Sequence, residues 1–560
     1  MKIRILKYKT LIAAFFLLGV IAGCSKFVDK KPLDEFSNDE YWKSEQNVRT
    51  YNWGFYEMFT GFGTGTNGDF YFSWFTDDQA SSGFQNFTLT ASASNSQWTF
   101  ANIRKANIML ENLEKVPMDE EAMNHWKGIA RFFRALAYYR LVQTFGDVPW
   151  INKSLDISES DIIYKPRDSR ALVMDSVLAD LNFAFANLRQ EDQDNTVNKD
   201  VALALISRVG LYEGTYRKYH TEKQEPDADK FLLASKEASS KLMAEGYSLN
   251  PDFRTVYSSV DLNGDPECIL YKQYVPGVLG HSVIGYTNSS TPMAGLTKNA
   301  VESFLCSDGL PIKVSKKYAG DATIEATRTN RDKRLLETIS DSLYYKGHLV
   351  GGFSASTGYR PAKFLQPADA NQLAPYNSTD APLFWLPEIL DNYAEACAEL
   401  DDMGKYTITQ ADLDKSVNLL RKRSSIPDLQ VKGHQGTAIV GVSFTDPAKD
   451  PDVTSLIWEI RRERRTELML CGFRFDDLMR WKKGWYMDNA KNPDIFLGAK
   501  VPADATAAHN SAGYLTPYAA GSNRVFEDPK NYLTAVPTGQ IALYPPDVQQ
   551  GMQNEGWGGE

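Results

Sequence analysis

Residues that bind metals or form disulfides are scarce in this 560-residue sequence, which has five cysteines and six histidines. It contains no CxxC pair and no HExxH motif, so the closely spaced ligands that mark zinc sites are missing. Apart from one cysteine near the N-terminus, the cysteines lie far apart in the chain. We therefore expect no metal site, and free thiols rather than disulfides at Cys268, Cys306, Cys397 and Cys471.

Motifs of catalysis and cofactor binding are also missing. The sequence has no GxSxG nucleophile elbow. Residues 63–68 match GxGxxG, but a helix is expected before them and an aromatic loop after them. A dinucleotide site instead has a strand before the motif and a helix after it. Residues 261–265 suggest a calcium loop, but Gly264 is misplaced and Lys272 stands where the bidentate glutamate belongs. We expect neither a cofactor nor an enzymatic activity.

Long apolar runs occur only at the N-terminus. Residues 11–22 form one, after a basic start, and the run is shorter than the roughly 20 residues that a transmembrane helix needs. A basic start, a short apolar core and small residues before a cleavage point are typical of a secretion signal. The four residues at the end of this signal, Ile21 to Cys24, resemble a bacterial lipobox, in which the cysteine receives lipid. The sequence therefore predicts a signal peptide over residues 1–23 and a lipidated tether over residues 24–38.

Positive charge is in deficit. The chain has 61 Lys and Arg against 71 Asp and Glu, a net charge of −10. Removal of the predicted signal peptide takes four basic residues away and leaves about −14, which argues against a nucleic-acid partner, since such proteins present basic surfaces.

Helical periodicity dominates both ends of the chain. The clearest helix covers residues 121–145, and Gly146 and Pro149 provide its stop signal. The other expected helices cover about 39–59, 98–115, 169–188, 199–219, 227–245, 387–400, 410–423, 455–470 and 475–483. The pattern predicts a mostly α protein: an irregular scaffold of successive helix pairs with long loops and a few short strands. Its parts are a helical N-terminal part (about 39–245), a loop-rich middle (about 247–383), a helical C-terminal part (about 386–483) and an irregular tail (484–560).

Six segments, in order along the chain, resemble the sequence blocks of the SusD/RagB family. They are Arg131–Trp150, Arg328–Leu335, Leu386–Leu400, Val417–Pro427, Ile460–Trp481 and Val536–Trp557. Three positions depart from the family pattern. Cys471 and Gln540 stand where an acidic residue is usual, and Glu555 stands where proline is usual.

The resemblance implies a single domain over residues 39–560 with a core of tetratricopeptide-like helix pairs. It also implies a lipid-anchored protein on the outside of the outer membrane, which works as the lid of a SusC-like TonB-dependent barrel. The usual ligand of the family is a glycan, and some members take peptide. We therefore expect glycan binding and delivery, with a peptide-binding lid as the alternative and a glycan-active enzyme as a less favoured one.

An aromatic segment, residues 70–75, is followed by two acids and an amide. Flat aromatic rings can cover the C–H faces of sugars, while carboxylates and amides bind the hydroxyls. The segment lies where family members often build their ligand site, although packing as core explains it equally well. The candidate ligand residues are Tyr71, Trp74, Asp77 and Asp78, with Tyr274, Tyr286, Trp485 and Tyr486 as further candidates.

Charged residues inside the family blocks have a structural interpretation. Arginine, unlike lysine, can bond a carboxylate in two places, so its use on amphipathic helices predicts buried ion pairs. The residues expected in this network are Arg131, Arg134, Glu463, Arg464, Glu467 and Arg474.

Overall fold

The computed structural model describes residues 41–72, 75–81, 83–87, 90–287, 294–342, 344–345, 348–349, 355–366, 374–432, 437–439 and 446–558. The predicted signal peptide, the tether and the lipidation site Cys24 lie outside the described residues. Within these ranges, no helix combines the length and the apolar character that crossing a bilayer would require.

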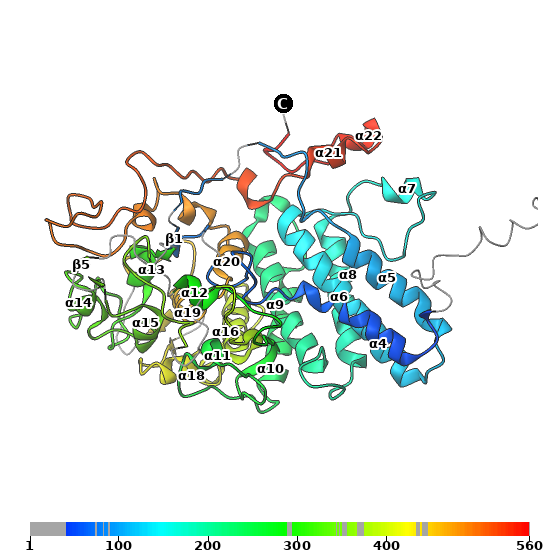
Figure 1. The fold of residues 1–560 in the computed structure, drawn as a ribbon, viewed down its shortest axis with the longest axis horizontal. Helices are drawn as coiled ribbons and strands as arrows, with labels where there is room; N and C mark the ends of the chain where they lie inside the picture. The colour runs from blue at the N-terminus through cyan, green and yellow to red at the C-terminus, as the bar shows by residue number, and fades with distance from the viewer. Residues whose placement is uncertain are drawn as a thin grey trace, which may run out of the picture.

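Long helices form one half of the molecule, and the loop-rich middle of the chain forms the other (Figure 1). The N-terminal helices pack in sequence order, α5 on α6, α6 on α8, α8 on α9 and α9 on α10. Their bounds are α4 (Glu45–Trp53), η1 (Tyr56–Met58), α5 (Ala101–Asn112), η2 (Leu113–Lys115), α6 (Glu120–Phe145), α7 (Ser160–Ile163), α8 (Arg170–Asn187), α9 (Lys199–Tyr219), η3 (Thr221–Lys223) and α10 (Ala228–Leu242). The mostly helical fold is confirmed, while its tetratricopeptide-like detail stays a prediction.

Side-chain caps determine where the long helices begin. The side chain of Asp119 accepts a hydrogen bond from the backbone N–H of Ala122 and starts α6. Asn198 caps α9 in the same way through the N–H of Val201. Gly146 ends α6 at a φ of 72°, a conformation that glycine adopts without strain.

The loop-rich half contains short helices and four antiparallel two-stranded sheets, β1–β3, β2–β6, β4–β5 and β7–β8, within the described residues. The helices there are α11 (Thr255–Ser258), α12 (Val283–Thr287), α13 (Lys298–Ser303), α14 (Ile324–Arg328) and α15 (Lys333–Thr338). The strands are β1 (Gln79–Ala80), β2 (Cys268–Lys272), β3 (Gly295–Leu296), β4 (Tyr344–Tyr345), β5 (His348–Leu349), β6 (Ala381–Trp385), β7 (Gln430–Lys432) and β8 (Thr437–Ile439).

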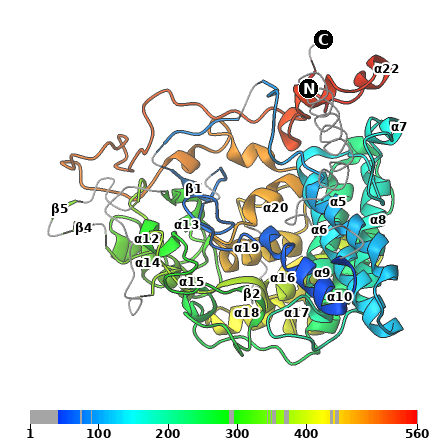
Figure 2. The same ribbon diagram turned by 45° about the vertical axis from the view of Figure 1, so that its right-hand side comes forward.

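The C-terminal helices lie between these two halves, as Figure 2 also shows. They are α16 (Leu386–Asp402), α17 (Gln410–Asp414), α18 (Val417–Arg423), α19 (Ser455–Glu467) and α20 (Arg474–Arg480). The tail adds η4 (Gly484–Met487), η5 (Pro493–Phe496), η6 (Lys530–Tyr532), α21 (Thr538–Ile541) and α22 (Pro546–Gln549). It returns to the N-terminal helices, where Tyr544 contacts Tyr164 with ring centroids 5.6 Å apart.

Helix α16 is the centre of the molecule, since every residue from Leu386 to Asp401 is buried. It contacts α9, α10 and α19. One face of this buried helix carries polar residues at helical spacing, which we call the α16 stripe: Glu388, Asn392, Glu395 and Glu399. Burying a charge without a partner costs much free energy, so the glutamates of this stripe require cations from the surrounding helices.

Arginines of three neighbouring helices pair with the α16 stripe. Arg208 of α9 donates to Glu388 at 2.6 Å, and Arg480 of α20 donates to Glu395 at 2.6 and 2.7 Å. Arg461 of α19 donates to Glu399 at 3.0 Å. Burial opposes ionisation of Glu399, but the charges of Lys218 and Arg461 outweigh it and lower its pKa to about 2.

A second buried ion cluster joins α15, α18 and α19. Arg334 contacts Asp332 at 2.7 Å, Glu463 at 2.6 Å and Glu467 at 3.0 Å. Arg421 contacts the other oxygen of Glu463 at 2.8 Å. The predicted buried network is therefore confirmed for both glutamates.

The other members of the predicted network also have acidic partners. Arg134 donates to Asp180 at 2.8 Å and Arg464 donates to Asp477 at 2.9 Å, both pairs being buried. Arg131 differs, because its side chain is 36% exposed and lies 3.9 Å from Asp180.

The four described cysteines are free thiols, as predicted. Cys471 lies beside the buried Lys363, with Sγ 3.1 Å from Nζ. The ammonium group also donates to the carbonyl oxygens of Glu467 and Met469 at 2.9 Å. Two backbone carbonyls and one thiol thus satisfy the buried Lys363 amine.

The Arg334 cluster gives a stability prediction. The substitution Arg334→Met removes the shared partner of three buried carboxylates, and we expect the free energy of unfolding to fall by about 3–5 kcal/mol. Urea unfolding monitored by circular dichroism measures this loss. The control Lys405→Met breaks the exposed pair with Asp229, whose atoms are 2.8 Å apart, and should leave the midpoint unchanged. Equal midpoints for wild type and Arg334→Met would contradict the importance of the cluster.

His281 gives a prediction of pH dependence. Burial lowers the pKa of its ring to about 3, and its Nδ1 accepts a hydrogen bond from the N–H of Val283 at 3.2 Å. The folded protein therefore favours the neutral ring, so the stabilisation is present above the unfolded pKa of 6.5 and is lost as the pH falls toward 3. We expect His281→Gln to lose less stability than wild type between pH 6.5 and 5, by about 1 kcal/mol per pH unit on average. Parallel pH profiles in urea unfolding would refute this role.

Candidate functional site

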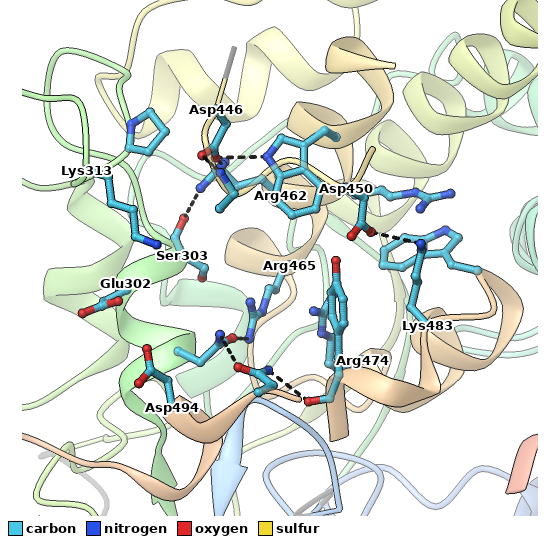
Figure 3. A pocket seen from close by; sticks show the side chains of 18 of the residues that line it. Glu302, Ser303, Lys313, Asp446, Asp450, Arg462, Arg465, Arg474, Lys483 and Asp494 are labelled. Carbon is cyan, nitrogen blue, oxygen red and sulfur yellow. Dashed lines mark hydrogen bonds and ion pairs between the residues drawn. The ribbon is translucent and has the colours of Figure 1, made fainter. Parts of the chain in front are cut away.

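A pocket of about 340 Å³ lies where α13, α19 and α20 meet the η4–η5 segment (Figure 3). Its volume falls within the range of about 300–1,000 Å³ that is typical of small-molecule sites. Two loops complete it, one around Lys313 and one from Asp446 to Asp450. The pocket therefore joins the loop-rich middle to the C-terminal helices.

Four aromatic residues line the pocket: Trp458, Trp481, Trp485 and Tyr486. Trp481 is held rigidly, since its ring N–H donates to Glu395 of the α16 stripe at 2.6 Å and Arg461 lies over its ring at 4.4 Å. Trp485 is only half-buried and meets Tyr486 edge to face, with centroids 4.3 Å apart. A flat, partly open ring of this kind can stack on a ligand.

Two guanidinium groups, those of Arg465 and Arg474, point into the pocket (Figure 3). Both are held from behind by the acids that follow the aromatic segment. Arg474 donates two hydrogen bonds to Asp77 at 2.8 Å, and Arg465 donates to Asp78 at 2.7 Å. These paired bonds fix the direction of each guanidinium.

The two acids respond differently to their burial. Burial opposes the ionisation of Asp77, but the charges of Arg465 and Arg474 outweigh it and lower its pKa. For Asp78, burial outweighs the charge of Arg465. The negative charge of Asp77 acts in the same direction as burial, and the pKa of Asp78 is raised. Asp77 is thus the charged anchor of both arginines.

A chain of hydrogen bonds runs along the pocket (Figure 3). Arg465 donates to the amide oxygen of Asn299 at 2.8 Å. Asn299 donates to Asn492 at 3.2 Å, and Asn492 donates to the carbonyl oxygen of Tyr486 at 3.0 Å. Helix α13, α19 and the η4–η5 segment are therefore held in register at this site.

The sequence-predicted ligand residues fall into four groups. Trp485 and Tyr486 line the pocket, whereas Asp77 and Asp78 lie directly behind it and contact it through the two arginines. Trp74 lies outside the described residues.

The remaining candidate tyrosines are not in this pocket. Tyr71 is fully buried and donates to the carbonyl oxygen of Ala294 at 3.1 Å. Tyr274 is buried as well, and its hydroxyl accepts a hydrogen bond from Gly63 at 3.0 Å. Tyr286 is half-buried against Phe72. Phe70 and Tyr71 thus match the core interpretation of the aromatic segment.

Among the arginines of α19, only Arg464 was predicted from the sequence, with a structural role, and Arg461 and Arg465 were missed. Their spacing carried a further signal: Arg461 and Arg465 are one helical turn apart, so they share a face, while Glu463 and Glu467 share the opposite one. The aromatic residues within 458–486, four of which line the pocket, gave a second signal.

Metal ligation has little support in the described part of the chain. No cluster of three or more His, Cys, Asp or Glu side chains there could hold a metal ion.

Comparisons with known proteins agree on one family. The family model described as "SusD family" matches residues 266–557, and the model described as "Starch-binding associating with outer membrane" matches residues 27–211. SusD-like protein P38 of Formosa agariphila is 25% identical over 507 residues, which cover 85% of this chain and 92% of that protein. SusD-like protein P2 of the same organism is 25% identical over 297 residues, 48% of this chain and 55% of that protein.

Solved structures show the same fold. A SusD-like carbohydrate-binding protein from Bacteroides fragilis has a TM-score of 0.68 at 18% identity, with 90% of this chain and 99% of that chain covered. A laminarin-binding SusD-like protein has a TM-score of 0.56 at 19% identity, with 92% of this chain and 100% of that chain covered. Since the SusD family model alone spans more than half of the sequence, the resemblance of the sequence blocks is confirmed, and the chain belongs to the SusD family.

Proposed function

We propose that this protein binds an oligosaccharide, or a segment of a polysaccharide, in the pocket of Figure 3 and does not transform it. The observation that carries the proposal is that the half-buried Trp485 lines the same pocket as Arg465 and Arg474, two hydrogen-bond donors that buried acids hold in place. Sugars offer an apolar face to an aromatic ring and hydroxyls to polar groups, so a pocket that holds both kinds of side chain suits a pyranose. The carbohydrate-binding relatives support the ligand class.

The positions of Asp77 and Asp78 refine the sequence hypothesis. Both carboxylates are buried, with 0% and 4% of each residue exposed, and both are bonded to arginines. We infer that they position Arg465 and Arg474 for the ligand rather than contact it themselves.

Delivery to a transporter is the second part of the proposal. We propose that lipid on Cys24 anchors the protein to the outside of the outer membrane, next to a SusC-like TonB-dependent barrel that receives the glycan. The lipobox-like residues 21–24 and the membrane association named for the matching family model support it. Acyl chains provide such an anchor without a transmembrane helix when more than one is attached.

Replacement of the pocket ring tests glycan binding. We expect Trp485→Ala to weaken the Kd for a bound glycan at least about fivefold, on the order of 1 kcal/mol, because an aromatic anchor is lost. Isothermal titration against an oligosaccharide panel measures it, and Trp53→Ala, a 44%-exposed ring on α4, is the matched control. Unchanged affinity in Trp485→Ala would move the site elsewhere. Binding of peptides but of no glycan would favour the peptide-binding alternative.

Replacement of the lipidation site tests the anchor. Without the thiol there is no atom to carry the diacylglyceryl thioether, so Cys24→Ala should leave the membrane fraction or accumulate uncleaved. Cell fractionation with mass spectrometry of the N-terminal peptide distinguishes these products from the lipidated wild type. Serine at the neighbouring position, changed as Ser25→Ala, serves as the control. Full membrane retention of processed Cys24→Ala would overturn the proposed anchor.

A further inference from the structure

The carboxylates that line the pocket are already matched by cations. Asp446 pairs with Arg462, and Asp450 lies 3.4 Å from Lys483. Glu302 and Asp494 share Lys298, at 2.7 and 3.0 Å. The carboxylates of the pocket are therefore already paired with cations of the protein when no ligand is bound.

The cations of the pocket are not all committed. Lys313 and Lys491 line the pocket with exposed side chains, and neither forms an ion pair with a carboxylate in the ranges that the structure describes. Figure 3 shows the Lys313 side chain reaching toward the pocket from its loop. Because these ammonium groups lack carboxylate partners within those ranges, they leave positive charge at the pocket.

The two arginines add oriented donors deeper in the pocket. Arg465 uses Nε and Nη2, and Arg474 uses the same two atoms, to bind acceptors of the protein. For either residue, no acceptor among the described residues bonds the third nitrogen, Nη1. Because Asp77 and Asp78 hold the opposite edges, these free N–H groups have fixed directions, as recognition of a planar or tetrahedral anion requires.

We propose that the saccharide taken by this pocket is acidic and carries a carboxylate or a sulfate ester. This inference rests on the proposed function and names the substrate class of the same site. The sugar ring stacks on Trp485, while its acidic group is bound by Arg465 or Arg474 and attracted by Lys313 and Lys491. In a chain with a net charge of −10, such uncommitted positive charge selects strongly for acidic over neutral ligands.

The test uses the full chain in detergent and isothermal titration with three oligosaccharide sets: neutral glucans, uronate oligomers and sulfated galactans. We expect the uronate or the sulfated set to bind tightest, with affinity that falls as salt is raised. The double variant Lys313→Gln and Lys491→Gln should weaken that binding about tenfold, because two attractive charges are lost. The matched control, Lys316→Gln and Lys317→Gln, removes the same charge from exposed residues of the same loop that do not line the pocket and should have no effect.

The outcomes separate the two proposals. Trp485-dependent binding of neutral glucans alone, or equal affinities in both double variants, contradicts the acidic ligand and leaves glycan binding intact. Absence of binding in all three sets contradicts the proposed function and this inference together. Preference between the uronate and sulfated sets identifies the acidic group.

Discussion

Burial of the carboxylates of α16 is the constraint on which the rest of the structure depends. A helix enclosed on all sides would ordinarily be apolar, yet this one carries Glu388, Glu395 and Glu399. An unpaired buried charge costs several kcal/mol, so each requires a cation at short range. The arginines that meet this demand come from α9, α19 and α20, which fixes how those helices sit against one another.

The same pairing builds the pocket. Glu395 holds Arg480 and the ring N–H of Trp481, and Glu399 holds Arg461, so the core side of the pocket is anchored to α16. Asp77 and Asp78 anchor the other side from a segment nearly 400 residues earlier in the chain. Preorganised groups lose little freedom when a ligand binds, which favours affinity in an open pocket.

The sequence predicted the helices well because caps and apolar spacing are local. Helix α9 spans the predicted 199–219. The single helix expected over 410–423 is instead two helices, because the helical conformation is interrupted between Asp414 and Val417. Trp485 could be proposed from the sequence, because an aromatic residue type is by itself suited to stack on a sugar. The roles of Asp77 and Asp78 could not, because acids beside aromatic residues predict sugar contacts equally well until the folded chain brings Arg465 and Arg474 to them.

A crystal structure with a bound acidic oligosaccharide tests most directly whether this preorganised pocket is the ligand site. We predict a sugar ring stacked on Trp485, with its carboxylate or sulfate at about 3 Å from Nη1 of Arg465 or Arg474 and with the Asp77 and Asp78 pairs unchanged. A saccharide bound elsewhere on the surface, with this pocket empty, would contradict it.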